Sequence, residues 1–212
     1  MSQPTSDDIR SYLEHHLSLY LDLLHQMVVV NSFTLNAAGV NAVGKLTADL
    51  FAPLGFTADF VPATDFHYGR HLVLTHAAAG DAPMLGLISH LDTVFPAAEE
   101  LSNDFHFRID GDRIYGPGTV DIKGGTVMIY MVLDGLRHFY PDLFAGVTWR
   151  VLLDAAEEVL AADFGALARR ELAGALAALV FEGGDVEDGR FLLVTARKGM
   201  ARYHIRVEGR GA

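Results

Sequence analysis

Cysteine is absent from this sequence of 212 residues, and its absence limits what the chain can bind. Without cysteine there is neither a disulfide framework nor a thiolate metal site. Any metal ion must therefore be held by histidine and carboxylate side chains. The absence of disulfides also favours a cytoplasmic location.

Positive charge is scarce, because 16 Lys and Arg residues face 27 Asp and Glu residues, giving a net charge of −11. Nucleic acids and anionic membranes are bound by clustered Lys and Arg side chains that displace counterions. No basic stripe is visible in the sequence. We therefore expect neither a nucleic-acid partner nor a membrane partner.

Long apolar runs are also missing. The longest, such as residues 84–88, are far shorter than the roughly 20 residues that cross a bilayer. Residues 1–8 lack the basic segment followed by an apolar one that marks an export signal. Half of the residues are hydrophobic and a fifth are charged, which is typical of a globular domain. We expect a soluble, cytoplasmic chain with no encoded export signal.

The hydrophobic pattern predicts an alternation of helices and strands. Helices are expected at residues 9–30, 40–54, 123–139 and 164–172, the first with Thr5 or Ser6 as N-cap. Strands are expected at 57–61, 71–76, 84–89, 147–153 and 176–181, with a long loop at 90–118. Apolar strands separated by amphipathic helices predict an α/β fold, with a central, mostly parallel sheet covered by helices on both faces.

In α/β folds the ligand crevice lies outside the carboxyl ends of the strands. The first polar strand end carries His90 and Asp92. His90 can bind a metal ion through one ring nitrogen while Asp92 holds the imidazole in the required tautomer. A His-x-Asp triplet also occurs by chance, so its position at a strand end is what gives it weight.

Two further segments deliver carboxylates close to strand or helix ends. Asp121 follows the glycine-rich stretch 115–118 and has two oxygens that can bridge two cations, although it could instead cap the following helix. Glu157 and Glu158 follow the apolar strand at 147–153, where adjacent buried carboxylates are unfavourable unless a cation offsets their repulsion. The alternative is a solvated acidic turn.

The fourth segment places Glu182 at the end of the apolar strand at 176–181, where a surface turn is the alternative interpretation. Each acidic or histidine motif thus closes a predicted strand or opens the next helix. Four independent coincidences of this kind are improbable, which favours one shared site.

In this order and spacing, the four segments resemble the M20 metallopeptidases, particularly the glutamate carboxypeptidase-like branch and the acetylornithine deacetylase-like members. The resemblance also includes Asn31-Ser32 and Gly116-Pro117-Gly118, and it covers nearly the whole chain. It implies a zinc-exopeptidase-like fold. A departure follows Glu158, where Val159-Leu160-Ala161 replaces the Gly-Ser that family members often carry.

The resemblance implies four metal ligands: His90, Asp121, Glu158 and Glu182. One ion would be held by His90, Asp121 and Glu182. Glu158 would hold a second ion, and Asp121 would bridge the two ions. Asp92 would orient His90, and Glu157 would be the general base. A cis peptide is also implied between Asp121 and Ile122.

Two divalent ions can lower the pKa of a bridging water and polarise a scissile carbonyl. The expected cofactor is Zn²⁺, two per complete site, although Mn²⁺ or Co²⁺ also suits an oxygen-rich site. The implied function is hydrolysis of an amide or peptide bond in a small peptide or an N-acyl amino acid.

The resemblance further implies that residues 1–198 are an incomplete catalytic domain and residues 199–212 the first strand of a truncated lid and dimerisation domain. The parent enzyme would be a homodimer through that lid, and its final metal ligand would lie outside this sequence. We therefore expect this fragment to be inactive alone. The alternatives are a catalytically silent metal-binding module, an N-acyl amino acid deacetylase as parent activity, and an interaction domain without metal.

Overall fold

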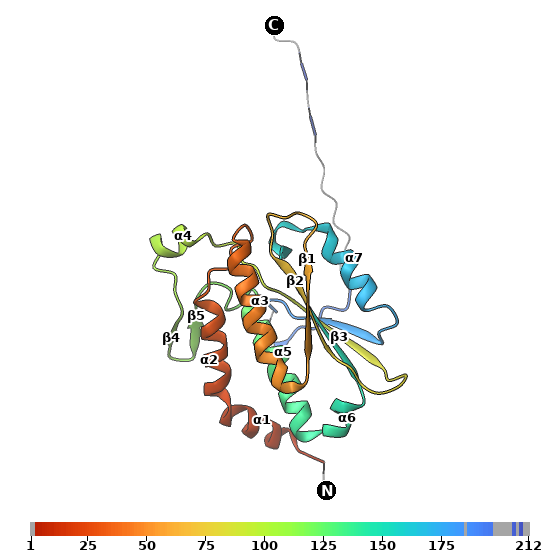
Figure 1. Ribbon diagram of the computed structural model, residues 1–212. Helices are drawn as coiled ribbons and strands as arrows, with labels where there is room; N and C mark the ends of the chain where they lie inside the picture. The colour runs from red at the N-terminus through yellow and green to blue at the C-terminus, as the bar shows by residue number, and fades with distance from the viewer. Residues whose placement is uncertain (1–2, 185, 197–204, 207, 210–212) are drawn as a thin grey trace.

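A computed structural model of the chain describes residues 3–184, 186–196, 205–206 and 208–209 (Figure 1). Its centre is a five-stranded sheet in the order β1-β2-β6-β3-β7. The strands are β1 (Thr57–Pro62), β2 (Arg70–His76), β3 (Met84–His90), β6 (Thr148–Asp154) and β7 (Ala177–Val180). β2 is antiparallel to β1 and β6, whereas β3 is parallel to β6 and β7. The sheet is therefore mixed: β2 runs opposite to the other four strands, which share one direction.

Helices cover both faces of this sheet. They are α1 (Ser6–His15), α2 (Leu17–Val28), α3 (Ala37–Phe51), α4 (Ala97–Ser102), α5 (Lys123–Phe139), α6 (Pro141–Ala145) and α7 (Ala162–Glu171). Short 3-10 turns are η1 (Ala52–Leu54) and η2 (Glu157–Val159). Two small hairpins are β4 (Arg108–Asp110) with β5 (Arg113–Tyr115), and β8 (Val186–Glu187) with β9 (Arg190–Phe191).

Alternation along the strands divides the core into two layers. In β2, Leu72 and Leu74 join the large cluster beneath α2, α3 and α5, while Val73 points to the opposite face. There Val73 packs with Leu152 of β6 and Leu167 of α7. The predicted α/β fold with helices on both faces is therefore confirmed (Figure 1).

The first helix was expected to be continuous, and this prediction is wrong. Thr5 caps α1 through a capping box with Asp8, as expected from the sequence. The helix then ends at His16, where φ is −97° and ψ is 5°, and α2 begins at Leu17. The apolar periodicity continues across this break, so it did not reveal the break.

The loop expected at residues 90–118 contains more structure than predicted, namely α4 and the β4–β5 hairpin. The helix predicted at 40–54 begins earlier, because Asn36 accepts a hydrogen bond from the backbone N–H of Gly39 and caps α3. α3 ends at Phe51, and η1 continues the helical segment to the predicted end at residue 54, where Gly55 follows with φ of 87° in the left-handed region.

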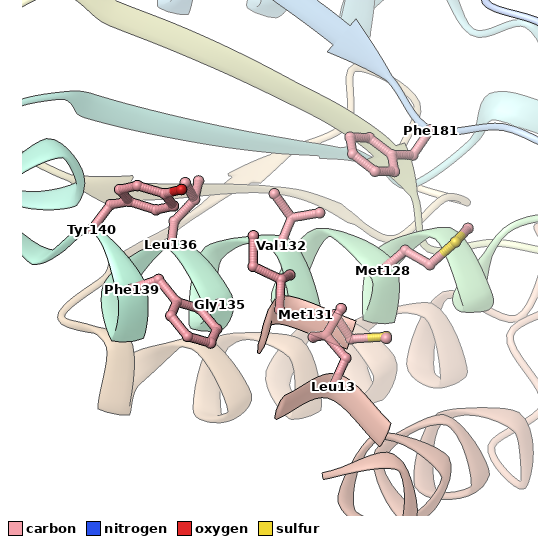
Figure 2. Close-up of a pocket in the computed structure, with 10 residues that line it drawn as sticks. Leu13, Met128, Met131, Val132, Gly135, Leu136, Phe139, Tyr140 and Phe181 are labelled. Atoms are coloured by element: carbon pink, nitrogen blue, oxygen red, sulfur yellow. The ribbon is translucent and has the colours of Figure 1, made fainter. Parts of the chain in front are cut away.

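An apolar cavity of about 430 Å³ lies between α1, α5 and the end of β7 (Figure 2). Its lining residues are Ile9, Leu13, Met128, Met131, Val132, Gly135, Leu136, Phe139, Tyr140 and Phe181. No acidic or histidine side chain lines it. The lining of this cavity is therefore apolar, unlike the strand ends, which carry histidine and carboxylate side chains.

The expected domain boundary at residue 198 and most of the strand expected within residues 199–212 lie outside the described residues. Within the ranges given above, no helix is long and apolar enough to cross a membrane.

Candidate metal centre

The parallel strands β3, β6 and β7 end at the same edge of the sheet, and this edge gathers the polar residues singled out in the sequence. His90 is the last residue of β3 and pairs with Asp154, the last residue of β6. Glu157 and Glu158 follow in η2, and Glu182 comes two residues after the end of β7. The sheet topology alone therefore brings three of the four segments together.

His90 is almost fully buried, with 1% of its surface exposed. Its Nε2 lies 2.9 Å from Oδ1 of Asp121 and 3.9 Å from Oε1 of Glu182. Its Nδ1 faces Asp92, at 3.1 Å from the backbone oxygen and 3.3 Å from Oδ1. One ring nitrogen thus faces Asp92, while the other points toward two carboxylates at the sheet edge.

Asp92 is fully buried, and its carboxylate accepts three hydrogen bonds. The hydroxyl of Thr34 donates at 2.7 Å, and the backbone N–H groups of Glu157 and Glu158 donate at 3.2 and 3.3 Å. Asp92 therefore connects the imidazole of His90 with the turn that carries both glutamates. Sequence reasoning did not identify Thr34, because no local motif links it to Asp92.

Asp121 enters the site from the glycine-rich segment before α5. Gly116 and Gly118 have φ of 146° and 78°, and a side chain at Gly118 would meet Lys123 and Thr93. The peptide between Asp121 and Ile122 is cis, as expected. The alternative that Asp121 caps the helix is wrong, because the N-cap of α5 is Ile122 and no side chain caps it.

Ligand atoms of His90, Asp121 and Glu158 all lie within 4.8 Å of one another. Burial, followed by the nearby charge of Asp121, raises the pKa of Glu158 to about 7. Burial also raises the pKa of the half-buried Glu157. These two glutamates are not a solvated acidic turn, because both side chains are partly buried against other carboxylates.

The electrostatics of His90 test whether these residues fit a cation. Burial lowers the pKa of His90, but the carboxylates of Asp92, Glu182 and Asp121 outweigh burial and raise it to about 9. The carboxylates around His90 thus favour a positive charge on or beside its ring. An imidazole with three or four carboxylates is a donor set that suits a divalent ion, so the residues fit a metal centre.

Lys123 is a second buried charged group that sequence reasoning did not identify. Its side chain is 1% exposed, and its Nζ donates to the backbone oxygen of Val30 at 3.0 Å. Burial lowers the pKa of Lys123 to about 8, against the opposing charge of Glu100. The lysine therefore ties the start of α5 to the segment that follows α2.

Comparisons with known proteins agree with this fold. The model of peptidase family M20/M25/M40 matches residues 86–209, a range that includes His90, Asp121, Glu158 and Glu182. The fold and the arrangement of strand-end residues define a metallopeptidase-type α/β domain. The chain belongs to the M20/M25/M40 peptidase family.

Curated relatives include carboxypeptidase G2 of Pseudomonas sp. (strain RS-16), 29% identical over 89% of this chain and 44% of the relative. Acetylornithine deacetylase of Vibrio vulnificus is 32% identical over 56% of this chain and 30% of the relative. Human carnosine dipeptidase 1 shares the fold, with a TM-score of 0.66 at 15% identity over 81% of this chain and 40% of that structure. The chain thus spans less than half the length of these relatives.

Proposed function

We propose that this chain carries the metal-binding part of a hydrolase that cleaves an amide or peptide bond in a small peptide or an N-acyl amino acid. The observation that carries the proposal is the convergence of His90, Asp121 and Glu158 within 4.8 Å, with Glu182 beside His90. Membership of a peptidase family supports hydrolysis as the reaction.

In this proposal His90, Asp121 and Glu182 would hold one ion, and Asp121 and Glu158 would hold a second. The ions, when bound, would supply a Lewis acid for the substrate carbonyl and lower the pKa of water. Zn²⁺ is the proposed metal because imidazole with carboxylates suits it, and Mn²⁺ or Co²⁺ would also fit an oxygen-rich set. Asp92 would keep the ring of His90 in the orientation that directs Nε2 toward the carboxylates.

Glu157 is the proposed general base. Its side chain is half-buried beside the ligand cluster, and burial raises its pKa toward the range in which a carboxylate accepts and releases a proton readily. It would take a proton from the attacking water and deliver that proton to the leaving amine. The hydrogen bond from its backbone N–H to Asp92 fixes the start of the turn from which it projects.

The names of the relatives support the proposed substrate class. Carboxypeptidase G2, acetylornithine deacetylase and carnosine dipeptidase 1 are named for cleaving peptides or acyl groups. We further propose that residues 1–198 form an incomplete catalytic domain and that a following lid domain mediates a homodimer in the parent enzyme. A metal-binding module without turnover is the alternative for the chain of 212 residues alone.

The proposal is tested by titrating Zn²⁺ into the wild-type chain and into His90→Ala. We expect the substitution to abolish tight binding, while the matched control His67→Ala, an exposed histidine paired with Asp65, binds like the wild type. Equal binding by His90→Ala would contradict the proposed centre. Hydrolysis of N-acyl amino acids and dipeptides by the Zn²⁺-loaded wild type would separate an enzyme from a silent module.

A further inference from the structure

A second buried histidine lies beside the turn that carries the two glutamates. His71, at the start of β2, is 1% exposed, and its ring lies between two aspartates. Its Nδ1 is 3.2 Å from Oδ1 of Asp154, and its Nε2 is 3.4 Å from Oδ2 of Asp163. The backbone N–H of Ala155 donates a hydrogen bond to Nδ1 at 3.1 Å.

In the sequence, these two aspartates lie on either side of the turn that carries Glu157 and Glu158. Asp154 is the last residue of β6, and Asp163 is in the first turn of α7. Glu157 and Glu158 lie between them. Since one ring contacts both ends of this segment, its position constrains the path of the backbone between residues 154 and 163.

We propose that His71 is a positioning residue, which clamps the two ends of the segment 154–163 and so sets where Glu157 and Glu158 stand relative to His90 and Asp121. This inference rests on the proposed metal centre for its functional meaning, and on the contacts of His71 for its structural one. The hydrogen bond and ion pairs of His71 given above all go to the two ends of this segment, so it acts through the backbone of the turn.

The charges around His71 support the clamp. Burial lowers the pKa of His71, but Asp154 and Asp163 outweigh burial and hold the pKa above its ordinary value. These two carboxylates, from the end of β6 and from α7, are the charged groups that face the ring. The neutral ring accepts from Ala155 at Nδ1, whereas the protonated ring has N–H groups facing both carboxylates. The added stabilisation of the protonated ring is fully present below the ordinary histidine pKa and is lost as pH rises through the raised pKa.

Asp163 is the more exposed of the two aspartates that contact His71. Burial raises the pKa of Asp163, but the backbone N–H of Thr64 and the ring of His71 outweigh burial and lower it. The hydrogen bond from Thr64 measures 2.6 Å. Asp163 is therefore held as a carboxylate against the imidazole, which is the state the clamp requires.

The inference is tested with His71→Gln in the chain of 212 residues. The matched control is His76→Gln, on the same strand, because the His76 ring packs against Phe56 and Phe144 at the opposite end of β2. Binding of Co²⁺ is followed by visible absorption, which reports both affinity and coordination. We expect His71→Gln to weaken Co²⁺ binding about tenfold and to change the spectrum, with His76→Gln unchanged.

Amide hydrogen exchange of metal-free protein provides a readout that does not depend on metal. We expect exchange in residues 156–161 to become faster in His71→Gln and, after correction for intrinsic rates, to lose a pH dependence that the wild type shows. Asp163→Asn, at the more exposed end of the clamp, should show a smaller change of the same kind. If His71→Gln does not fold, the exchange measured in Asp163→Asn decides whether the clamp exists.

Unchanged exchange in both variants, or equal effects of His71→Gln and His76→Gln, would overturn the clamp. A wild-type chain that binds no Co²⁺ would instead overturn the proposed metal centre, while the exchange measurement would still decide whether His71 holds the turn.

Discussion

Oδ2 of Asp92 lies 3.3 Å from the backbone nitrogen of Glu158, so the carboxylate that faces the ring of His90 also holds the turn opposite that ring. A single buried side chain thereby couples the end of β3 to the segment after β6. The distance between an imidazole and two glutamates is fixed by this coupling, which explains how a turn of irregular backbone can present ligands reproducibly.

Replacing Asp92 with Ala should reduce both stability and metal affinity. The change removes the acceptor of the N–H groups of Glu157 and Glu158, and it leaves the hydroxyl of Thr34 only the backbone oxygen of Thr93 at 3.4 Å. Each buried unsatisfied group costs about 1–3 kcal/mol. We expect the free energy of unfolding in urea to fall by at least about 2 kcal/mol. Thr34→Val, which removes one donor, should lower it by less; an equal loss in the two variants would contradict this account.

Replacing Glu157 with Gln should separate metal binding from catalysis. The proposed base is not a proposed ligand, so Glu157→Gln should bind Zn²⁺ as tightly as the wild type in a calorimetric titration. Where a longer polypeptide containing this chain hydrolyses a substrate, the same change should lower turnover roughly 10²–10⁴-fold. A decrease below tenfold would remove Glu157 from the role of general base.

The contact between the N-terminal helices and α5 should weaken at alkaline pH. The hydroxyls of Tyr12 and Tyr20 donate to Oδ2 of Asp134 at 3.0 and 2.9 Å. Burial, then the hydrogen bond to Asp134, raises the pKa of Tyr12 from 10.0 to about 12, and the same causes raise the pKa of Tyr20. Their stabilisation is present below pH 10 and is lost as pH rises through the raised values.

The fluorescence of the buried Trp149, the one tryptophan of the sequence, can follow urea unfolding between pH 8 and 11.5. We expect wild-type stability to fall above pH 10, and the fall to be smaller in Tyr20→Phe. At pH 8 the same variant should be less stable by about 1.5–3 kcal/mol, because it loses a hydrogen bond to a charged acceptor. An identical pH profile for the two proteins would rule out this assignment.

Much of the fold could be predicted because local pattern and final structure agree. Residues 123–139 were expected to be helical, and α5 spans Lys123–Phe139, since its amphipathic face packs directly on the core. The break at His16 was missed because the residues on both sides keep a helical apolar pattern. The β4–β5 hairpin was missed because its three-residue strands are too short to establish a period.

The candidate site was predictable where residues close parallel strands, as His90 does, because parallel strands end at one edge. The supporting contacts were not predictable in this way. Thr34 and Asp92 are 58 residues apart, and His71 meets Ala155 across 84 residues. Such pairs depend on the three-dimensional packing of loops, for which a single sequence carries no local signal.

The central claim is that His90, Asp121 and Glu182 hold one ion firmly, while the second position, shared by Asp121 and Glu158, is weak in this chain. Metal analysis of protein loaded with Zn²⁺ and then dialysed tests it most directly. We predict close to one equivalent of Zn²⁺ per chain of 212 residues. A value near zero, or two tightly held ions, would contradict the account.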